Sequence, residues 1–180
     1  ALSKVDPEKD FSSDDQVLLM DLASQIAIAL ENYRLSADAE QTYVETITAL
    51  AMAVEARDEY TRGHTNRVGE YCNKLAKAFN LDDKTVKMLN DASNLHDIGK
   101  IGVPDEILRK PSPLTAEEMK VVYEHSIIGE NILKPIRSLS ELCYLVRHHH
   151  ERVDGSGYPD GIKGDAISLP LHIMIVADCF

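Results

Sequence analysis

The stretch His96-Asp97-Ile98-Gly99-Lys100 governs the interpretation of this sequence, because it ends an apolar run with two different metal ligands. Neutral imidazole binds borderline metals and a carboxylate can bridge two of them, so the His-Asp doublet suits a binuclear site better than a closed structural zinc site. Gly99 is a natural helix terminator. We expect it to leave Lys100 in the loop beyond, where an anionic substrate would lie.

A lone His-Asp doublet more often forms a surface hydrogen bond or a helix cap, so the interpretation depends on similar residues elsewhere. His149-His150 repeats the arrangement, because it stands at the expected end of a helix, directly before a Gly-rich loop. Neighbouring helical residues diverge by about 100°, so two of them share a metal site only at a helix end or in a groove. Other candidates are spread along the chain: His64, His125, His148 and Asp178.

Each of these residues also has an ordinary structural interpretation. His64 could serve only to start a helix, and His125 taken alone would more often be a half-buried, hydrogen-bonded histidine. His148 points a further step round its helix, so an exposed polar patch is the better interpretation for it. Asp178 lies in an apolar segment, where an unpaired carboxylate is costly to bury, so it needs a metal or a cation.

Composition limits the class of protein. The 180 residues carry a net charge of -11, which argues against binding to a nucleic-acid polymer or a membrane surface. The 3 cysteines have no CxxC spacing and predict no disulfide framework, which fits a reducing cytoplasm. No apolar run approaches the roughly 20 residues of a membrane span, and the N-terminus lacks the pattern of a signal peptide. We therefore expect a cytoplasmic chain without membrane insertion.

Apolar periodicity predicts an all-α fold. A helix is expected from about residue 14, with a stripe at Leu19, Leu22, Ile26, Ala29 and Tyr33. The stripe fades over residues 36–40 and resumes over 44–54, which predicts one long or barely broken helix that links two modules. Its apolar face either pairs with a second copy in a dimer or packs on its own domain.

Several local signals place the remaining elements. Capping boxes are expected at Ser13-Asp14-Asp15-Gln16, Thr115-Ala116-Glu117-Glu118 and Ser138-Leu139-Ser140-Glu141. Lys110-Pro111-Ser112-Pro113 is expected to be loop, and the Gly- and Pro-rich residues 153–170 predict a long functional loop. The apolar residues 171–180 are interpreted as a helix that presents Asp178.

Several of these stretches, in this order, closely resemble the HD-GYP domain: Tyr60-Thr61-Arg62-Gly63-His64, Leu95-His96-Asp97-Ile98-Gly99-Lys100-Ile101-Gly102-Val103-Pro104, His125, His149-His150-Glu151-Arg152, Asp154-Gly155-Ser156-Gly157-Tyr158-Pro159 and Ala177-Asp178. That domain is a bacterial branch of the HD metal-dependent phosphohydrolases, and its members degrade cyclic di-GMP. The resemblance covers roughly residues 43–180 and implies an HD-domain helical bundle. Residues 1–35, with Phe11-Ser12-Ser13-Asp14-Asp15, resemble the last segment of a GAF sensor domain. We therefore expect a GAF-like remnant and linker helix over 1–35 and an HD-GYP domain over 36–180.

The resemblance also implies a set of ligands for two divalent metals. One metal would take His64, His96, Asp97 and Asp178, and the other would take Asp97, His125, His149 and His150. Some members hold a third metal through a Glu at the position of Tyr60, so two metals are expected here. Imidazole and carboxylate ligands without thiolate favour iron or manganese, although geometry alone does not exclude zinc.

The implied function is hydrolysis of the phosphodiester bonds of cyclic di-GMP by a metal-bridging hydroxide. Asp97 and Lys100 would be catalytic, with Lys100 also contacting the substrate and stabilising charge in the transition state. Gly157-Tyr158-Pro159 would shape the pocket wall or a surface for a partner such as a diguanylate cyclase with a GGDEF domain. Two alternatives are a non-hydrolytic module that binds the dinucleotide or that partner, and an HD phosphohydrolase for another nucleotide.

The sequence departs from the family pattern at two places. His172 stands where the family usually has Arg. The sequence also stops two residues past Asp178, before the basic residues expected to bind the second phosphate. We therefore expect a domain that is truncated at its C-terminus.

Overall fold

The computed structural model describes residues 12–58 and 63–180, so the expectations at Phe11 and Tyr60 lie outside the described residues. Within those two ranges every regular element is a helix, which confirms the all-α prediction. The chain divides into two compact units after Tyr43, and they consist of residues 1–43 and 44–180. Among the described helices, none is both long enough and apolar enough to cross a membrane.

Helix α1 spans Ser13–Glu55 and continues without a break through residues 36–40, where the apolar stripe fades. The predicted cap is wrong by one residue. The N–H of Asp15 donates to Ser12 Oγ over 3.2 Å, and the N–H of Ser12 donates to Asp15 Oδ2 over 3.0 Å. Ser12 rather than Ser13 therefore caps the helix, because Asp15 then stands three residues later, where its side chain can reach back.

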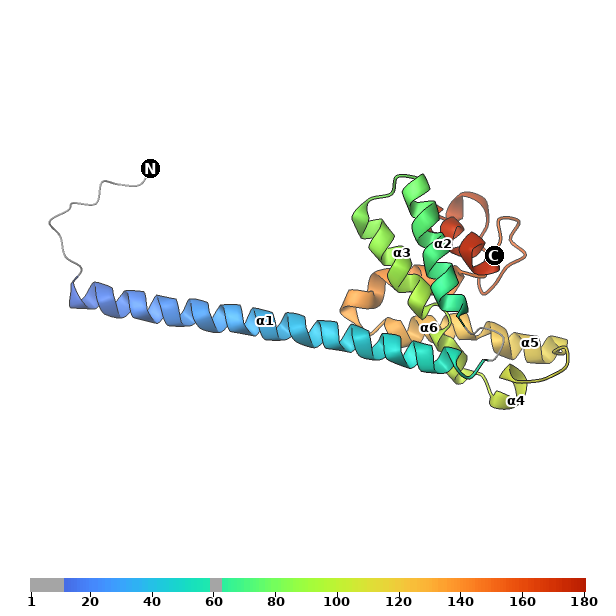
Figure 1. Cartoon of the computed structure of the whole chain (residues 1–180), viewed down its shortest axis with the longest axis horizontal. Helices are drawn as coiled ribbons and strands as arrows, with labels where there is room; N and C mark the ends of the chain where they lie inside the picture. The colour runs from blue at the N-terminus through green and yellow to red at the C-terminus, as the bar shows by residue number, and fades with distance from the viewer. Residues whose placement is uncertain (1–11, 59–62) are drawn as a thin grey trace. The chain divides into compact units, whose positions relative to one another are not determined.

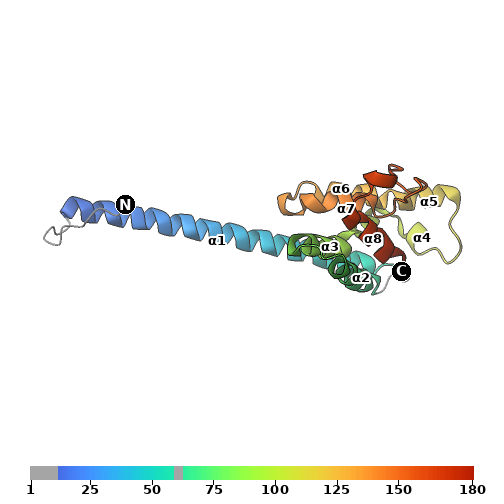
Figure 2. The same ribbon diagram turned by 90° about the horizontal axis from the view of Figure 1, so that it is seen from above.

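The second unit contains the other helices, drawn in Figures 1 and 2. They are α2 (His64–Ala78), α3 (Asp83–Leu95), η1 (Ile98–Gly102), α4 (Asp105–Leu108), α5 (Ala116–Tyr123), α6 (His125–Leu133), η2 (Arg137–Leu142), α7 (Cys143–His148), η3 (Gly164–Ala166) and α8 (Leu169–Cys179). Helix α2 packs against α3 and α8, while α6 packs against η1 and α7. Figure 2 shows α2 and α3 on one side of this unit, α5 and α6 on the other, and α8 between them.

One core holds these helices together. Its fully buried side chains include Leu89, Leu95, Leu133, Leu145, Leu171 and Met174. The last turns of α1 join this core, because Ala51 and Val54 are buried and Val44 and Ile47 pack against it. For residues 44–54, packing on the chain's own domain is therefore the correct interpretation of the apolar stripe.

Two of the local signals have different outcomes. Thr115 and Glu118 form the predicted capping box, since the N–H of Glu118 donates to Thr115 Oγ1 and the N–H of Thr115 donates to a Glu118 carboxylate oxygen. The box expected at Ser138 is wrong, because residues 137–142 form the 3-10 helix η2. The carboxylate of Glu141 instead lies 2.9 Å from Lys84 Nζ on α3, so it does not reach back to cap a helix.

Gly99 has a different role from the predicted helix terminator. Helix α3 ends at Leu95, and Gly99 lies inside η1. A Cβ atom at Gly99 would overlap the backbone carbonyl of His125 and lie 2.5 Å from the backbone N of Gly129. Only hydrogen fits between these two backbones, and this close approach brings the His96-Asp97 doublet beside the start of α6.

We expect Gly99→Ala to lower the free energy of unfolding by about 3 kcal/mol, the upper range for overpacking, because the atoms it meets are backbone. Gly102→Ala is the matched control, since its Cβ would meet only the end of the Ile128 side chain, which can rotate. Thermal and urea unfolding of both variants measure the difference. Equal stability of the two variants would show that the contact between η1 and α6 is not tight.

Candidate metal centre

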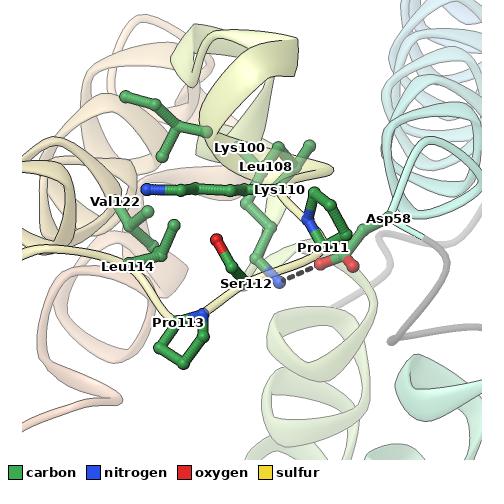
Figure 3. Close-up of a pocket in the computed structure, with 10 residues that line it drawn as sticks. Asp58, Lys100, Leu108, Lys110, Pro111, Ser112, Pro113, Leu114 and Val122 are labelled. Atoms are coloured by element: carbon green, nitrogen blue, oxygen red, sulfur yellow. Dashed lines mark hydrogen bonds and ion pairs between the residues drawn. The ribbon is translucent and has the colours of Figure 1, made fainter.

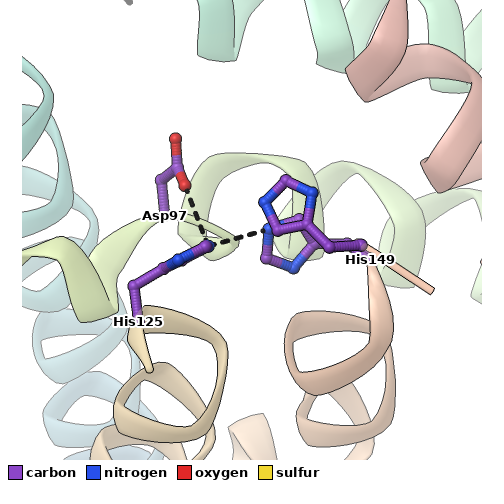
Figure 4. A group of neighbouring side chains, drawn as sticks. Asp97, His125 and His149 are labelled. Carbon is purple, nitrogen blue, oxygen red and sulfur yellow. Dashed lines mark hydrogen bonds and ion pairs between the residues drawn. The ribbon is translucent and has the colours of Figure 1, made fainter. Parts of the chain in front are cut away.

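The structure brings all seven predicted metal ligands into two adjacent groups. One group contains Asp97, His125, His149 and His150, and the other contains His64, His96 and Asp178. Within each group, one nitrogen or oxygen ligand atom per residue lies within 4.8 Å of the others. Figure 4 shows Asp97, His125 and His149 of the first group converging from three different segments. The expected partition is reproduced except that Asp97 belongs to one group only.

Three of the imidazoles are oriented by the same backbone contact. His96 Nδ1 lies 2.8 Å from the carbonyl of Ser93. His125 Nδ1 lies 2.7 Å from the carbonyl of Val122, and His149 Nδ1 lies 2.7 Å from the carbonyl of Val146. Each acceptor is three residues earlier, in the last turn of α3, α5 or α7, where carbonyls have no partner within their helix. A carbonyl only accepts, so Nδ1 carries the proton and the opposite nitrogen faces the site.

The facing nitrogens are suited to a cation. His125 Nε2 and His149 Nε2 lie 3.2 Å apart, and both rings already carry their proton on Nδ1 when neutral. Two lone pairs that face each other at this distance repel unless a positive charge lies near both. The donor set of this group, three imidazoles and one carboxylate, therefore fits a divalent metal such as iron, manganese or zinc.

Asp97 connects the two groups. Its Oδ1 lies 3.5 Å from His125 Nε2, while its Oδ2 lies 3.5 Å from His96 Nε2. Asp178 also contacts residues of both groups. Its Oδ1 lies 2.9 Å from His64 Nε2, and its Oδ2 lies 3.6 Å from His150 Nδ1. Asp97 thus faces two imidazoles, and Asp178 faces three, because its Oδ1 also lies 3.4 Å from His96 Nε2. Both carboxylates are placed where they could bind a cation together with these rings.

The imidazoles of the site differ in their pKa values. Burial lowers the pKa of His150 to about 4 and lowers the pKa of His149 well below its usual value. These rings are neutral near pH 7 and keep their lone pairs available for a metal. Burial also lowers the pKa of His96, but the neighbouring carboxylates of Asp97 and Asp178 outweigh it and raise that pKa to about 9.

Both carboxylates stay ionised despite burial. Burial raises the pKa of Asp97, but the positive charges of His96 and Lys100 outweigh it, and the pKa falls below its usual value. Burial likewise raises the pKa of Asp178, but the neighbouring imidazoles of His64 and His96 lower it by more, so it also ends well below its usual value. Asp178 lies beside the imidazoles of His64 and His96, and its expected pairing with a metal or a cation stays a prediction.

Lys100 lies beside the centre, inside η1. Its Nζ is 2.8 Å from Asp97 Oδ2 and 3.1 Å from Asp58 Oδ2, and only 13% of its side chain is exposed. Its ammonium group thus lies beside the expected ligand Asp97, but Lys100 belongs to the helix η1 and not to the expected loop. Asp58 was not predicted to have a role, because it comes directly after the linker helix and only the folded chain brings it to Lys100.

The loop with Gly157, Tyr158 and Pro159 lies against the histidine doublet. The N–H of Tyr158 donates to the carbonyl of His150 over 3.2 Å. Its ring stacks on Tyr123 with centroids 3.9 Å apart and lies 4.8 Å from the ring of His150. A Cβ at Gly157 would lie 2.5 Å from both the His150 carbonyl oxygen and the Arg152 nitrogen, so a larger residue does not fit there. Tyr158 thus lies beside a ligand rather than on a distant surface.

The prediction that His148 is exposed is wrong. Its side chain is 11% exposed and its Nε2 lies 2.9 Å from Asp160 Oδ2. Arg147 reaches the same carboxylate with Nε at 2.7 Å, so Asp160 is contacted by both His148 and Arg147. His172 is half-buried, and its Nδ1 lies 3.1 Å from the carbonyl of Ser168.

Glu151 is a further residue to which sequence reasoning gave no role. It is 0% exposed, and its Oε1 accepts the backbone N–H groups of Asp160 over 2.7 Å and Gly161 over 2.9 Å. Its Oε2 is also buried and has no hydrogen-bond partner among the described residues. Glu151 thereby fastens the end of the Tyr158 loop to the histidine doublet. Its position directly after that doublet is the one feature of the sequence that could have indicated a role for Glu151 near the site.

The fold and the site define an all-helical domain that gathers imidazoles and carboxylates as metal ligands. Residues 48–180 match the HD domain family, and the chain belongs to that family. Curated relatives agree with this assignment. The chain is 38% identical over 177 residues to the 3'3'-cGAMP-specific phosphodiesterase 2 of Vibrio cholerae, covering 96% of this chain and 34% of the relative.

Two other relatives are named for cyclic di-GMP. The chain is 39% identical over 160 residues to the cyclic di-GMP phosphodiesterase response regulator RpfG of Xanthomonas campestris, covering 87% of this chain and 42% of the relative. It is 42% identical over 145 residues to a cyclic di-GMP phosphodiesterase of Thermotoga maritima, covering 78% of this chain and 39% of the relative. The matched part of the chain thus spans less than half the length of each of these proteins.

We expect Glu151→Ala to lower the free energy of unfolding by about 2 kcal/mol, because it leaves two backbone donors without their acceptor. Hydrogen exchange at the amides of Asp160 and Gly161 should become faster. Glu141→Ala, which removes an exposed carboxylate paired with Lys84, is the control and should change neither quantity. Unchanged exchange at both amides in Glu151→Ala would contradict the proposed fastening of the loop.

Proposed function

We propose that this chain contains the HD-GYP phosphohydrolase domain of a cyclic di-GMP phosphodiesterase. The observation that carries the proposal is the pair of ligand groups joined by Asp97, whose two carboxylate oxygens face His125 and His96 at 3.5 Å each. A phosphodiester anion repels hydroxide, so its hydrolysis requires charge neutralisation and an activated water. Two neighbouring cations meet both requirements.

The proposed ligands follow from the residues that converge. Asp97, His125, His149 and His150 would hold one divalent metal, while His64, His96, Asp178 and the other oxygen of Asp97 would hold the second. Iron and manganese are the metals we propose, since the site offers nitrogen and oxygen donors and no thiolate. When bound, the metals would lower the pKa of water and withdraw charge from the phosphate.

The remaining residues would act on the substrate. Lys100 carries a positive charge 2.8 Å from Asp97 Oδ2, so it would counter the charge that develops on the phosphate oxygens in the transition state. Tyr158, stacked on Tyr123 and beside His150, would form a wall of the pocket with Gly157 and Pro159. We propose the pocket wall rather than a partner surface for this loop, because its ring contacts a metal ligand.

Cyclic di-GMP is the substrate we propose, since two relatives described above are named for its hydrolysis. A second candidate is another cyclic dinucleotide, because the relative that covers 96% of this chain is named a 3'3'-cGAMP-specific phosphodiesterase. Both candidates are intracellular messengers with the same backbone, and they differ in one base. A domain that degrades either would act in the cytoplasm.

The N-terminal part suggests how the domain is regulated. We propose that residues 1–35 are the end of a GAF-like sensor and the linker helix, and that residues 36–180 are the HD-GYP domain. The exposed residues Leu19, Leu22 and Ile26 of α1, with Ala29 and Tyr33, are spaced alternately by three and four residues, as in a coiled coil. A parallel homodimer through this stripe would bury them. A GGDEF-domain cyclase remains a further proposed partner.

Turnover tests the proposed function. The chain, loaded anaerobically with iron or manganese, should convert cyclic di-GMP to a linear product that chromatography separates. Asp97→Asn should lower turnover by at least about 100-fold, because it removes the ligand that joins the two groups. Asp165→Asn, at an exposed residue of η3, should keep full activity. Elemental analysis measures the metal that each variant holds.

Three outcomes distinguish the alternatives. Dinucleotide binding without turnover in either metal would favour the non-hydrolytic module. Hydrolysis of another cyclic dinucleotide in preference to cyclic di-GMP would favour the second substrate. Full activity of Asp97→Asn would rule out the proposed centre.

Sedimentation velocity at micromolar concentration tests the homodimer. We expect the chain to sediment as a dimer and Ile26→Glu to shift it to a monomer, because a charge would be buried in the apolar stripe. Ser24→Glu places the same charge two residues away, outside the stripe, and should remain dimeric. If Ile26→Glu sediments like the unaltered chain, α1 does not form the interface.

A further inference from the structure

A cavity of about 430 Å³ lies next to the candidate centre. Lys100 lines it and also contacts Asp97 Oδ2 at 2.8 Å, so the cavity and the centre share one side chain. Its volume falls within the roughly 300–1,000 Å³ that is typical of small-molecule sites. A ligand with an anionic group at the centre could therefore extend into this space.

The walls of the cavity are apolar and its few polar groups are separated. Leu108, Pro111 and Val122 contribute apolar surface, while Lys110 and Ser112 contribute hydrogen-bonding groups. Figure 3 shows these side chains around the cavity, together with Lys100 bonded to Asp58. A nucleobase has two apolar faces and a polar edge, so its surface complements this lining.

Lys110 is held in place by the start of α5. Its Nζ lies 2.8 Å and 2.6 Å from the two carboxylate oxygens of Glu118. Glu118 is itself fixed by the capping box with Thr115. An ammonium has three N–H donors and Glu118 engages it from one side, so the group can also donate to a ligand in the cavity that it lines.

A donor at this place distinguishes the two purines. Guanine presents two acceptors side by side, N7 and O6, whereas adenine presents the acceptor N7 beside an amino donor. An ammonium can only donate, so it attracts the guanine edge and is repelled by the amino group of adenine.

We propose that this cavity is a nucleobase subsite and that Lys110 selects guanine. The proposal rests on the proposed function, because it is the phosphodiester at the Asp97 centre that would bring the attached base beside Lys100. The subsite would give the domain its preference among cyclic dinucleotides. It assigns a role to the Lys110-Pro111-Ser112-Pro113 loop.

Lys110→Met tests the selection of guanine. The affinity for cyclic di-GMP, measured by calorimetry, should fall by about 10-fold to 100-fold, which is the range for a lost hydrogen bond to a charged group. The affinity for cyclic di-AMP should change by less than about 3-fold. Lys84→Met removes a matching surface Lys–Glu pair, with Glu141, and should leave both affinities unchanged. Hydrolysis of bis(4-nitrophenyl) phosphate, which has no nucleobase, should be the same in the unaltered chain and in both variants.

A second variant tests the cavity itself. Ser112→Trp, at an exposed position of the lining, should fill it and weaken the binding of both dinucleotides while hydrolysis of the small diester is preserved. Equal weakening of both dinucleotides by Lys110→Met, or no change with either variant, would overturn the proposal. Loss of small-diester hydrolysis in either variant would also overturn it, since the residue would then act on the centre.

The subsite and the proposed function can fail separately. If the unaltered chain hydrolyses the small diester but binds neither dinucleotide, the subsite is wrong and the centre remains hydrolytic. If it binds cyclic di-GMP through Lys110 but hydrolyses no diester, the subsite holds and the enzymatic function fails.

Discussion

The arrangement of the centre depends on the close approach of η1 to the start of α6. Gly99 has no side chain, so its backbone can lie against the backbone of His125 and Gly129. The doublet His96-Asp97, directly before η1, is thereby brought to the imidazole of His125 on another helix. Close packing of two backbones thus sets the separation of ligands that are far apart in sequence.

The site then balances its own charge. Two buried carboxylates, Asp97 and Asp178, would be costly to bury alone, and imidazoles and Lys100 surround them. The rings of His149 and His150 contribute lone pairs instead of charge, since burial lowers the pKa of both. A site of this kind attracts cations through its carboxylates and keeps the imidazoles of His149 and His150 unprotonated.

The sequence predicted the helices well and the contacts between them only in part. Apolar periodicity gave the continuous α1, and a Thr-to-Glu spacing gave the cap of α5, because both signals are local. The Ser138 signal failed because Glu141 pairs with Lys84, which no local pattern reveals. The two doublets pointed to the centre through residue type and position at helix ends.

The residues that support the centre could not be predicted from spacing. Asp58 contacts Lys100 across 42 positions of sequence, and Glu151 fastens a loop through backbone donors that carry no side-chain signature. His148 has the same residue type as its neighbours His149 and His150, yet it turns to Asp160 instead of the centre. Tertiary packing decides such cases, because adjacent residues on a helix face different directions.

The orientation of the imidazoles has a consequence for how far related sequences can diverge. His96, His125 and His149 are each aimed by a main-chain carbonyl at the end of a helix, and the identity of the residue that supplies this carbonyl is immaterial. Substitution at Ser93, Val122 or Val146 therefore leaves the acceptor in place, provided that the helix still ends there. The aim of these ligands therefore depends on where each helix ends and not on which side chain stands at the acceptor residue, so insertions or deletions that shift a helix end would misdirect them.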